Sequence, residues 1–290
     1  MDYQTKQYFL IADLRMLLLA EEKLLESRGF EPFKINGGET DICMIFRQTE
    51  VLSLAKSERL FCGEGFDIIR TEHGLVRCYH EYQQPDKVYA LRYRQDCSNI
   101  TIEYRKEATA YFAKYRSCFY HMALEDLLLP FCRFVLHASY IRTKFGGLLF
   151  SGASGVGKST QADLWCRYRG AGLVNGDKPI VGRLADGTWR AYGSPYAGSS
   201  RCYRNESDRV GAVIFLRQSP ENSLRRLASD EAFRRLYANT IVNAWNPEFV
   251  SKICDLLNEF SVEIPAYEFC CTPDLQAVCF LEQALEGGES

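Results

Sequence analysis

The residues best suited to chemistry lie in one short stretch in the middle of the chain. Residues 152–159 read GASGVGKS, which fits G-x-x-x-x-G-K-[S/T] at every fixed position. The glycines allow backbone conformations in which successive N–H groups turn inward, and Lys158 supplies a point charge for phosphate oxygens. Ser159 supplies a hydroxyl ligand for Mg²⁺. This spacing predicts a loop that holds the phosphates of a nucleotide.

The flanking residues give this loop the setting that phosphate binding requires. The apolar run GGLLFS before it is typical of a buried strand, and residues 158–169 after it are typical of a helix. A helix N-terminus adds positive partial charge beside the phosphates. A glycine turn without a ligand would need neither Lys158 nor Ser159, so we favour nucleotide binding. The predicted nucleotide contacts are Gly152, Ser154, Gly155, Val156, Gly157, Lys158, Ser159 and Thr160.

Two further ionisable residues lie near the loop in the sequence. Asp177 follows the strand-like run GLVN, and His137 begins an expected strand that pairs with GLLF through the turn TKFG. An acid at a strand end beside a phosphate loop is suited to hold Mg²⁺. Asp177 is alternatively a turn residue before Lys178. His137 is alternatively a hydrogen-bonded residue of the core.

This combination of motifs resembles the C-terminal catalytic domain of HPr kinase/phosphorylase and, more distantly, the ATP-dependent phosphoenolpyruvate carboxykinases. The matching pieces are LHASYI, GLLFSGASGVGKST, LVNGDKPIV and VGAVIFLRQ, within roughly residues 135–285. The resemblance implies that Lys158 binds the transferred phosphate and that Ser159 and Asp177 hold Mg²⁺. It implies that His137 lies beside the reacting phosphoryl group. The resembled kinases assemble as oligomers, so a homo-oligomer is expected.

The chain departs from this family at two places. The kinases carry two consecutive Asp residues on the acidic strand, the first of which is the general base, and Gly176 occupies that position here. The later EIRG segment of the family is replaced by YGSPYAGSSRCYRN. Arg201 and Arg204 in this segment are candidates for cationic stabilisation of a transition state. They are alternatively solvated loop arginines.

Composition and charge limit the classes of protein to which this chain can belong. The chain has 290 residues, of which 47% are hydrophobic and 25% charged, as in folded proteins of one large or two medium domains. A formal charge of -2 provides no basic field for nucleic acid or an anionic membrane. The start of the chain shows neither a signal peptide nor a membrane span. We therefore expect a cytoplasmic protein that binds neither nucleic acid nor membrane.

The cysteines do not form a recognisable framework. There are 12 of them, scattered without a CxxC pair and including the neighbours Cys270 and Cys271. This arrangement predicts reduced thiols, as expected in the cytosol. A structural zinc site is the alternative, but the close ligand pairs that it needs are missing.

Residues 1–130 are expected to form a β-rich domain with a linking helix. Short, partly alternating runs such as DICMIFR, KVYALRYR and NITIEYR are separated by turn formers, which is typical of antiparallel strands. After Glu107 apolar residues recur at helical spacing, and Pro130 should end or kink the helix. The apolar positions of this helix are Phe112, Tyr115, Phe119, Ala123 and Leu127.

Residues 131–290 are expected to form the nucleotide-binding domain. PIVGRLADGTWRAYG predicts a hairpin that turns at Asp186 and Gly187, and RVGAVIFLRQ predicts a buried strand. Helices are predicted at about 221–239 and 247–259, followed by the strand VEIPAYEF and a helix after Pro273. The expected fold class is α/β (α+β), an HPr kinase/phosphoenolpyruvate carboxykinase-like mixed-sheet P-loop domain preceded by a β-rich domain.

These features favour an ATP- and Mg²⁺-dependent kinase that transfers the γ-phosphoryl group to a hydroxyl on a protein, peptide or small molecule. Its predicted catalytic residues are Lys158, Asp177, His137 and Arg201. The alternative, motivated by Gly176, is a catalytically weak or inactive ATP-binding regulatory protein. Carboxykinase chemistry would need further metal ligands and an arginine set that we do not find. A motor ATPase is disfavoured, because it would need an acid at the end of a later apolar strand and the sequence shows none there.

Overall fold

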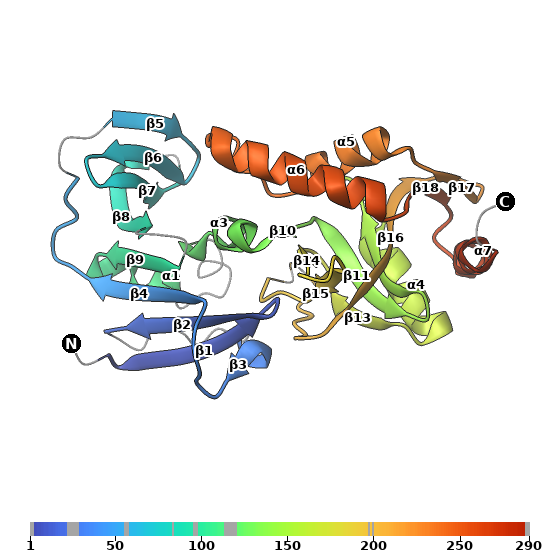
Figure 1. Ribbon diagram of the computed structural model, residues 1–290, viewed down its shortest axis with the longest axis horizontal. Coiled ribbons are helices and arrows are strands. Elements are labelled where there is room, and N and C mark those ends of the chain that lie inside the picture. Colours follow the sequence, from blue (N-terminus) through green and yellow to red (C-terminus); the bar gives the residue numbers. More distant parts are fainter. Residues whose placement is uncertain are drawn as a thin grey trace. The chain divides into compact units, whose positions relative to one another are not determined.

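The chain folds into two compact units, residues 1–127 and 128–290. The computed structural model describes residues 3–21, 29–54, 58–82, 84–94, 98–112, 121–196, 198 and 200–287. Each unit contains a large mixed sheet accompanied by helices, so the protein is of the α+β class (Figure 1). None of the described helices combines the length and the apolar character needed to cross a bilayer.

The first unit is built on one sheet with the strand order β3-β1-β2-β4-β9-β8-β7-β6-β5. Two neighbouring pairs, β2 with β4 and β4 with β9, are parallel. The prediction of antiparallel strands is wrong for these pairs, because parallel neighbours are joined by long crossovers that alternation within a strand does not reveal. The strands are β1 (Thr5–Ile11), β2 (Leu14–Ala20), β3 (Lys34–Ile35), β4 (Ile42–Gln48), β5 (Glu58–Cys62), β6 (Phe66–Thr71), β7 (Gly74–Glu81), β8 (Gln84–Arg94) and β9 (Asn99–Tyr104).

Short helical segments follow this sheet. The prediction of one long helix from Glu107 is wrong at Ala123, whose φ angle of +48° interrupts the helical backbone, and Glu107 itself lies in a 3-10 turn. The predicted positions Tyr115 and Phe119 lie outside the described residues. The predicted break at Pro130 is confirmed, because α3 gives way there to a 3-10 turn. The segments are a 3-10 turn at Lys106–Ala108, α1 (Thr109–Phe112), α3 (Leu124–Leu128) and a 3-10 turn at Leu129–Phe131.

Two buried ion pairs fasten α3 to the sheet of the first unit. Arg77 donates to Glu125 at 3.2 Å, and Arg92 donates to Asp126 at 3.1 Å. All four side chains are buried. Buried charges need partners because desolvation is costly, so removal of one member would destabilise this unit strongly.

The sheet of the second unit is organised around its longest strand, β16 (Ser207–Gln218). The beginning of β16 pairs with β15 in antiparallel fashion, and its remainder pairs in parallel with both β12 and β18. The sheet order is β10-β14-β15-β16-β12-β11-β13, with β18 and β17 added beside β16. The other strands are β10 (Arg133–Val135), β11 (Ala138–Thr143), β12 (Gly146–Ser151), β13 (Gly172–Asn175), β14 (Ile180–Arg183), β15 (Trp189–Tyr192), β17 (Ser223–Arg226) and β18 (Ala266–Cys271).

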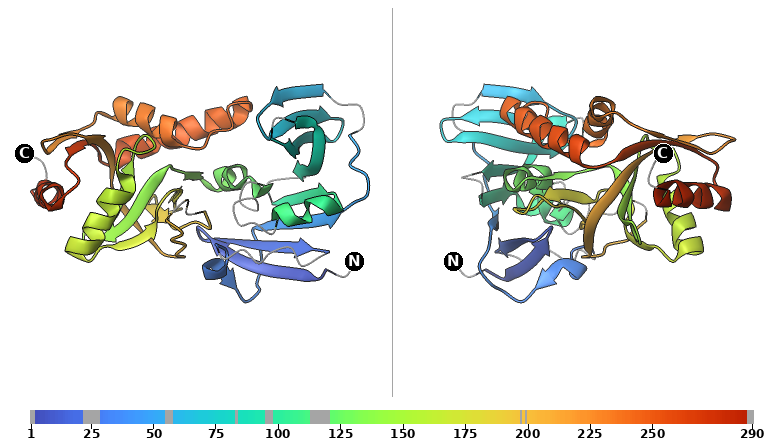
Figure 2. Two further views of the ribbon diagram at one scale, coloured as in Figure 1. Left: turned by 180° about the vertical axis from the view of Figure 1, so that it is seen from behind. Right: turned by 45° about the vertical axis from the view of Figure 1, so that its right-hand side comes forward.

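Helices cover both faces of this sheet (Figures 1 and 2). Alternate residues of the strands point to opposite faces. On one face Leu148, Phe150 and Ile214 pack with α4 and α7, whereas on the other Leu149 and Val213 pack with α5 and α6. The helices are α4 (Lys158–Arg169), α5 (Ser229–Asn239), α6 (Pro247–Glu263) and α7 (Leu275–Glu286).

Several predicted elements of this unit are confirmed and two need correction. The hairpin that turns at Asp186 and Gly187 is confirmed as β14 and β15. The helix predicted from residue 221 begins only at Ser229, because β17 occupies part of that range as an edge strand paired with β18. The strand predicted from Val262 begins at Ala266, because α6 continues through Glu263.

A cluster of charged side chains connects β17, α5 and β18. Glu231 on α5 accepts two hydrogen bonds from Arg225 at 2.8 and 2.9 Å and one from Arg235 at 2.7 Å. Both arginines also pair with Glu268. The hydrogen bonds from Arg225 are the main reason that the pKa of Glu231 falls to about 2. The cluster therefore remains ionised far into the acid range.

We expect Glu231→Gln to destabilise the protein at neutral pH. A carboxyl group whose pKa is lower in the folded than in the unfolded chain stabilises the fold above its ordinary pKa of 4.5, and this contribution disappears as the pH falls toward about 2. Urea unfolding at several pH values should therefore show a difference from wild type that shrinks below pH 4.5.

Asp230→Asn is the matched control for this measurement. Asp230 lies on the same helix and pairs with Arg234 in a more exposed i,i+4 arrangement, which contributes little. A loss of stability in Glu231→Gln that is independent of pH, or one no larger than in Asp230→Asn, would contradict the role of the cluster.

Candidate functional site

The predicted phosphate loop connects β12 to α4 in the second unit. Three of its residues, Gly152, Gly155 and Gly157, have positive φ angles of 134°, 80° and 108°. Residues with a side chain rarely adopt these angles, so the loop depends on glycine at these positions. The loop ends directly at the N-terminus of α4, where backbone N–H groups without helical partners attract anions.

Lys158 lies at the first position of α4 with its amino group turned back to the loop. This group donates to the carbonyl oxygens of Gly152 and Ala153 at 2.9 and 3.0 Å. An ammonium group has three N–H donors, so one remains for a phosphate oxygen. The side chain is buried, and this burial lowers the pKa of Lys158 although the negative charge of Asp177 opposes the effect.

The acidic residue Asp177 is positioned by the fully buried side chain of Asn175 at the end of β13. The Asn175 carboxamide oxygen accepts from the backbone N–H groups of Asp177 and Lys178 at 3.0 and 2.8 Å. Its nitrogen donates to the carbonyl oxygen of Tyr196 at 2.8 Å and to Ser194. One side chain thus connects the acidic turn to the segment that follows β15.

His137 and Asp177 form a pair at the start of β11. The distance between His137 Nε2 and Asp177 Oδ1 is 3.3 Å, and the backbone N–H of Ala138 donates to the Asp177 carbonyl at 3.0 Å. Burial alone would raise the pKa of Asp177, but the hydrogen bond from His137 and the charge of Lys178 outweigh it, so the pKa lies below its usual value. Asp177 is therefore a carboxylate at neutral pH.

These groups surround one cavity of about 500 Å³. The structure brings most of the predicted site residues to its wall. Gly152 and Val156 do not line this cavity. The carbonyl of Gly152 accepts a hydrogen bond from Lys158, and Val156 lines a different cavity. The lining consists of His137, Ser139, Ser154, Gly155, Gly157, Lys158, Ser159, Thr160, Ala162, Asp163, Leu173, Gly176, Asp177 and Ser200.

The two predicted arginines do not line this cavity. Arg201 is exposed and has a positive φ angle of 50°. Arg204 is also exposed, and its guanidinium lies 3.6 Å from the carboxylate of Glu206. A contact between Arg201 and a transferred phosphoryl group therefore stays a prediction.

The structure adds residues that the sequence did not single out. The hydroxyl of the fully buried Ser139 donates to the carbonyl oxygen of Gly176 at 3.1 Å, which holds the backbone at Gly176. Asp163 adds a second carboxyl group to the cavity wall. Asn followed by Gly is a turn signal, and an Asn side chain there can accept from the backbone two residues on, so this pair would have identified Asn175.

Gly198 approaches the Asp177 side chain from the segment after β15. A Cβ atom at this position would lie 2.5 Å from Asp177 Oδ2, and the φ angle of Gly198 is +54°. Only glycine avoids this clash, so the residue limits where the carboxylate can lie.

Among the described residues, no three His, Cys, Asp or Glu side chains gather as a self-sufficient metal site. Mg²⁺ is commonly held by one or two carboxylates together with the phosphates of a substrate and water. The oxygen donors of Ser159 and Asp177 in one cavity fit such a shared site.

Comparison with known proteins gives a weak similarity to a solved structure. No protein-family model matches the chain, and no curated protein matches it. Among solved structures, the chain is similar to the Hpr(Ser) kinase/phosphatase from Coxiella burnetii, at 14% sequence identity and a TM-score of 0.32. This match covers 53% of the present chain and 93% of the other.

We expect Gly198→Ala to displace the Asp177 carboxylate. The added methyl group clashes with Oδ2, so the variant should lose about 1 kcal/mol from the positive φ angle and more from the clash. Urea unfolding measures the loss, and a crystal structure shows the new distance between His137 and Asp177.

Gly187→Ala provides the matched control. Gly187 also has a positive φ angle, +85°, but its Cβ would meet nothing closer than 3.9 Å. Equal losses of stability in the two variants, together with an unmoved Asp177, would show that Gly198 does not constrain the carboxylate.

Proposed function

We propose that this protein is an ATP- and Mg²⁺-dependent kinase that transfers the γ-phosphoryl group to a hydroxyl of a protein, peptide or small molecule. The observation that carries the proposal is the cavity in which Lys158, Ser159 and the His137–Asp177 pair meet at the phosphate loop. Phosphoryl transfer depends mainly on positioning and on charge neutralisation, and these are the properties of this cavity.

Each group has a role in this reaction. The loop and the start of α4 hold the phosphates, and Lys158 offers its remaining N–H donor to the transferred phosphate. Ser159 and the Asp177 carboxylate supply oxygen ligands for Mg²⁺. Bound Mg²⁺ neutralises charge on the phosphate oxygens.

The acceptor hydroxyl loses its proton as the reaction proceeds. Its oxygen bonds to the γ-phosphorus while the bond from that phosphorus to the bridging oxygen breaks, which leaves ADP. Donation from His137 Nε2 to Asp177 leaves the other ring nitrogen as a proton acceptor. We assign the proton to His137, since Gly176 provides no carboxylate for this purpose.

The domain assignment follows from the same proposal. Residues 131–290 would form a nucleotide-binding domain of the HPr kinase type, and residues 1–130 a β-rich domain with a linking helix. Assembly into a homo-oligomer and contact of Arg201 with the phosphoryl group belong to this proposal as well.

We expect Lys158→Ala to reduce ATP-dependent phosphate transfer strongly. Loss of a preorganised donor to developing charge reduces turnover about 100- to 1,000-fold. Asp177→Asn should raise the Mg²⁺ concentration needed for ATP binding, because a charged ligand is lost. The measurements are ATP titration with and without Mg²⁺, and transfer of labelled phosphate to a peptide library and to hydroxyl metabolites.

Lys252→Ala is the control for the loss of one lysine. Lys252 is exposed on α6, where it pairs with Glu248, and it should leave binding and transfer unchanged. The proposal fails if the wild-type protein transfers no phosphate to any of these acceptors, or if Lys158→Ala retains more than about a tenth of the wild-type rate.

A regulatory protein that binds ATP without rapid turnover is the second candidate, and Gly176 is the observation that favours it. The family that the sequence resembles has its general base at this position. The φ angle of Gly176 is not among the positive values of the described glycines, so the backbone conformation there does not itself require glycine.

Gly176→Asp distinguishes the two candidates. If the natural site is tuned for binding, this variant should gain turnover at least tenfold with unchanged ATP affinity, because it restores a carboxylate beside the phosphates. Gly176→Asn has nearly the same shape without the base and should show no gain. A wild-type turnover that neither variant increases would argue against the regulatory candidate.

A further inference from the structure

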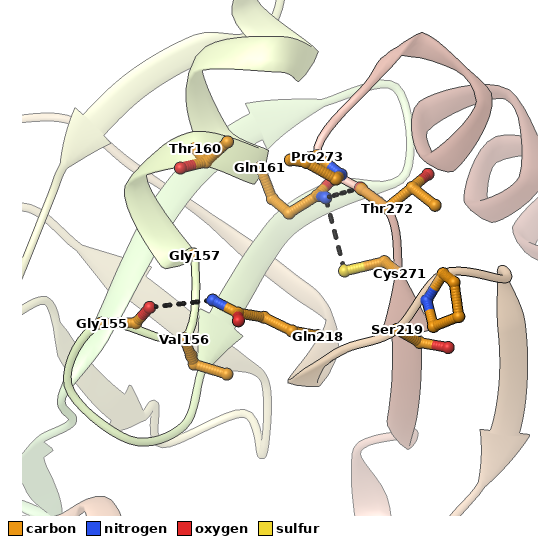
Figure 3. Close-up of a pocket in the computed structure, with 11 residues that line it drawn as sticks. Gly155, Val156, Gly157, Thr160, Gln161, Gln218, Ser219, Cys271, Thr272 and Pro273 are labelled. Atoms are coloured by element: carbon orange, nitrogen blue, oxygen red, sulfur yellow. Dashed lines mark hydrogen bonds between the residues drawn. The ribbon is translucent and has the colours of Figure 1, made fainter.

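A second cavity of about 500 Å³ borders the phosphate loop (Figure 3). Its wall combines the loop and the start of α4 with two segments that follow strands. These are residues 218–220 at the end of β16 and residues 271–273 at the end of β18. Its volume lies within the range of about 300–1,000 Å³ that is usual for small-molecule sites.

The two cavities share part of the phosphate loop. Gly155, Gly157 and Thr160 line both of them. A chain of phosphates lying along this stretch of backbone would therefore have one end near each cavity.

The cavities differ in charge. The first contains Lys158, His137, Asp163 and Asp177. None of the described residues that line the second carries a charge, and burial raises the pKa of its Cys271 thiol to about 11. The first suits the charged, reacting end of a nucleotide, whereas the second suits an uncharged group.

Hydrogen bonds hold the second cavity in shape. The Gln161 amide nitrogen donates to the Thr272 carbonyl at 2.9 Å and lies 3.4 Å from the Cys271 sulfur (Figure 3). Gln218 donates to the carbonyl of Gly155 at 3.2 Å, and Asn222 accepts from the Thr272 N–H at 3.0 Å. The walls are thus connected to one another, as expected of a preformed site.

We infer that this second cavity binds the nucleoside half of a nucleoside triphosphate whose terminal phosphate enters the first cavity. The inference rests on the proposed function, since it requires that the loop holds the phosphates. To the proposed function the inference adds the identity of the segments that contact the base and the ribose. Inorganic tripolyphosphate carries the phosphates without the nucleoside. It therefore tests phosphate binding by the loop separately from nucleoside binding by the second cavity.

Cys271→Phe tests the inference by filling the cavity. Cys271 is 6% exposed and lines the cavity from β18. Titration of the full chain with Mg²⁺ and either ATP or tripolyphosphate should show at least tenfold weaker binding of ATP to this variant. Binding of tripolyphosphate should stay within about twofold, so the preference for ATP disappears.

Cys270→Phe controls for side effects of this change. It places the same ring one residue earlier, and alternate residues of a strand point to opposite faces. This variant should bind ATP and tripolyphosphate as the wild type does.

If Cys271→Phe does not fold, light-driven crosslinking of 8-azido-ATP to the wild-type chain tests the inference without a variant. The label should fall in residues 155–161, 218–220 or 271–273. A folded Cys271→Phe that binds ATP normally, or a label elsewhere, overturns the inference. Equal wild-type affinities for ATP and tripolyphosphate overturn this inference alone, and binding of neither overturns the proposed function as well.

Discussion

The site depends on one buried carboxamide, that of Asn175. Its oxygen accepts from two successive backbone N–H groups of the acidic turn, and its nitrogen donates to the segment around Tyr196. The side chain is fully buried, so the N–H groups of Asp177 and Lys178 would lose this acceptor without it. The direction of the Asp177 carboxylate, and with it the pairing to His137, follows from this small network.

The parallel strands of the second unit explain why both cavities lie at one edge of the sheet. Ser151 at the end of β12 is opposite Phe215 near the end of β16, and Gln218 at the end of β16 is opposite Cys271 at the end of β18. In sheets of this kind ligands bind beyond the carboxyl ends of parallel strands. The loop and the two other cavity-lining segments all begin at these ends.

The parts of the fold that could be predicted from sequence are those with local signals. The strand, glycine loop and α4, and the hairpin of β14 and β15, follow from residue periodicity and turn chemistry. The edge strand β17 could not be predicted, because its pairing with β18 joins residues about forty positions apart. Gly198 was missed for a similar reason, since only the folded chain brings it against Asp177.

The length of β16 has a consequence for how this protein can vary. A strand has a side-chain period of two, so the insertion of one residue would turn every later side chain to the other face. In β16 such a change would exchange the faces of Val213 and Ile214 and move the segment after Gln218. An added residue in the exposed turn at Asp186 would leave both cavities intact. Related chains should therefore differ in length at that turn and keep β16 constant.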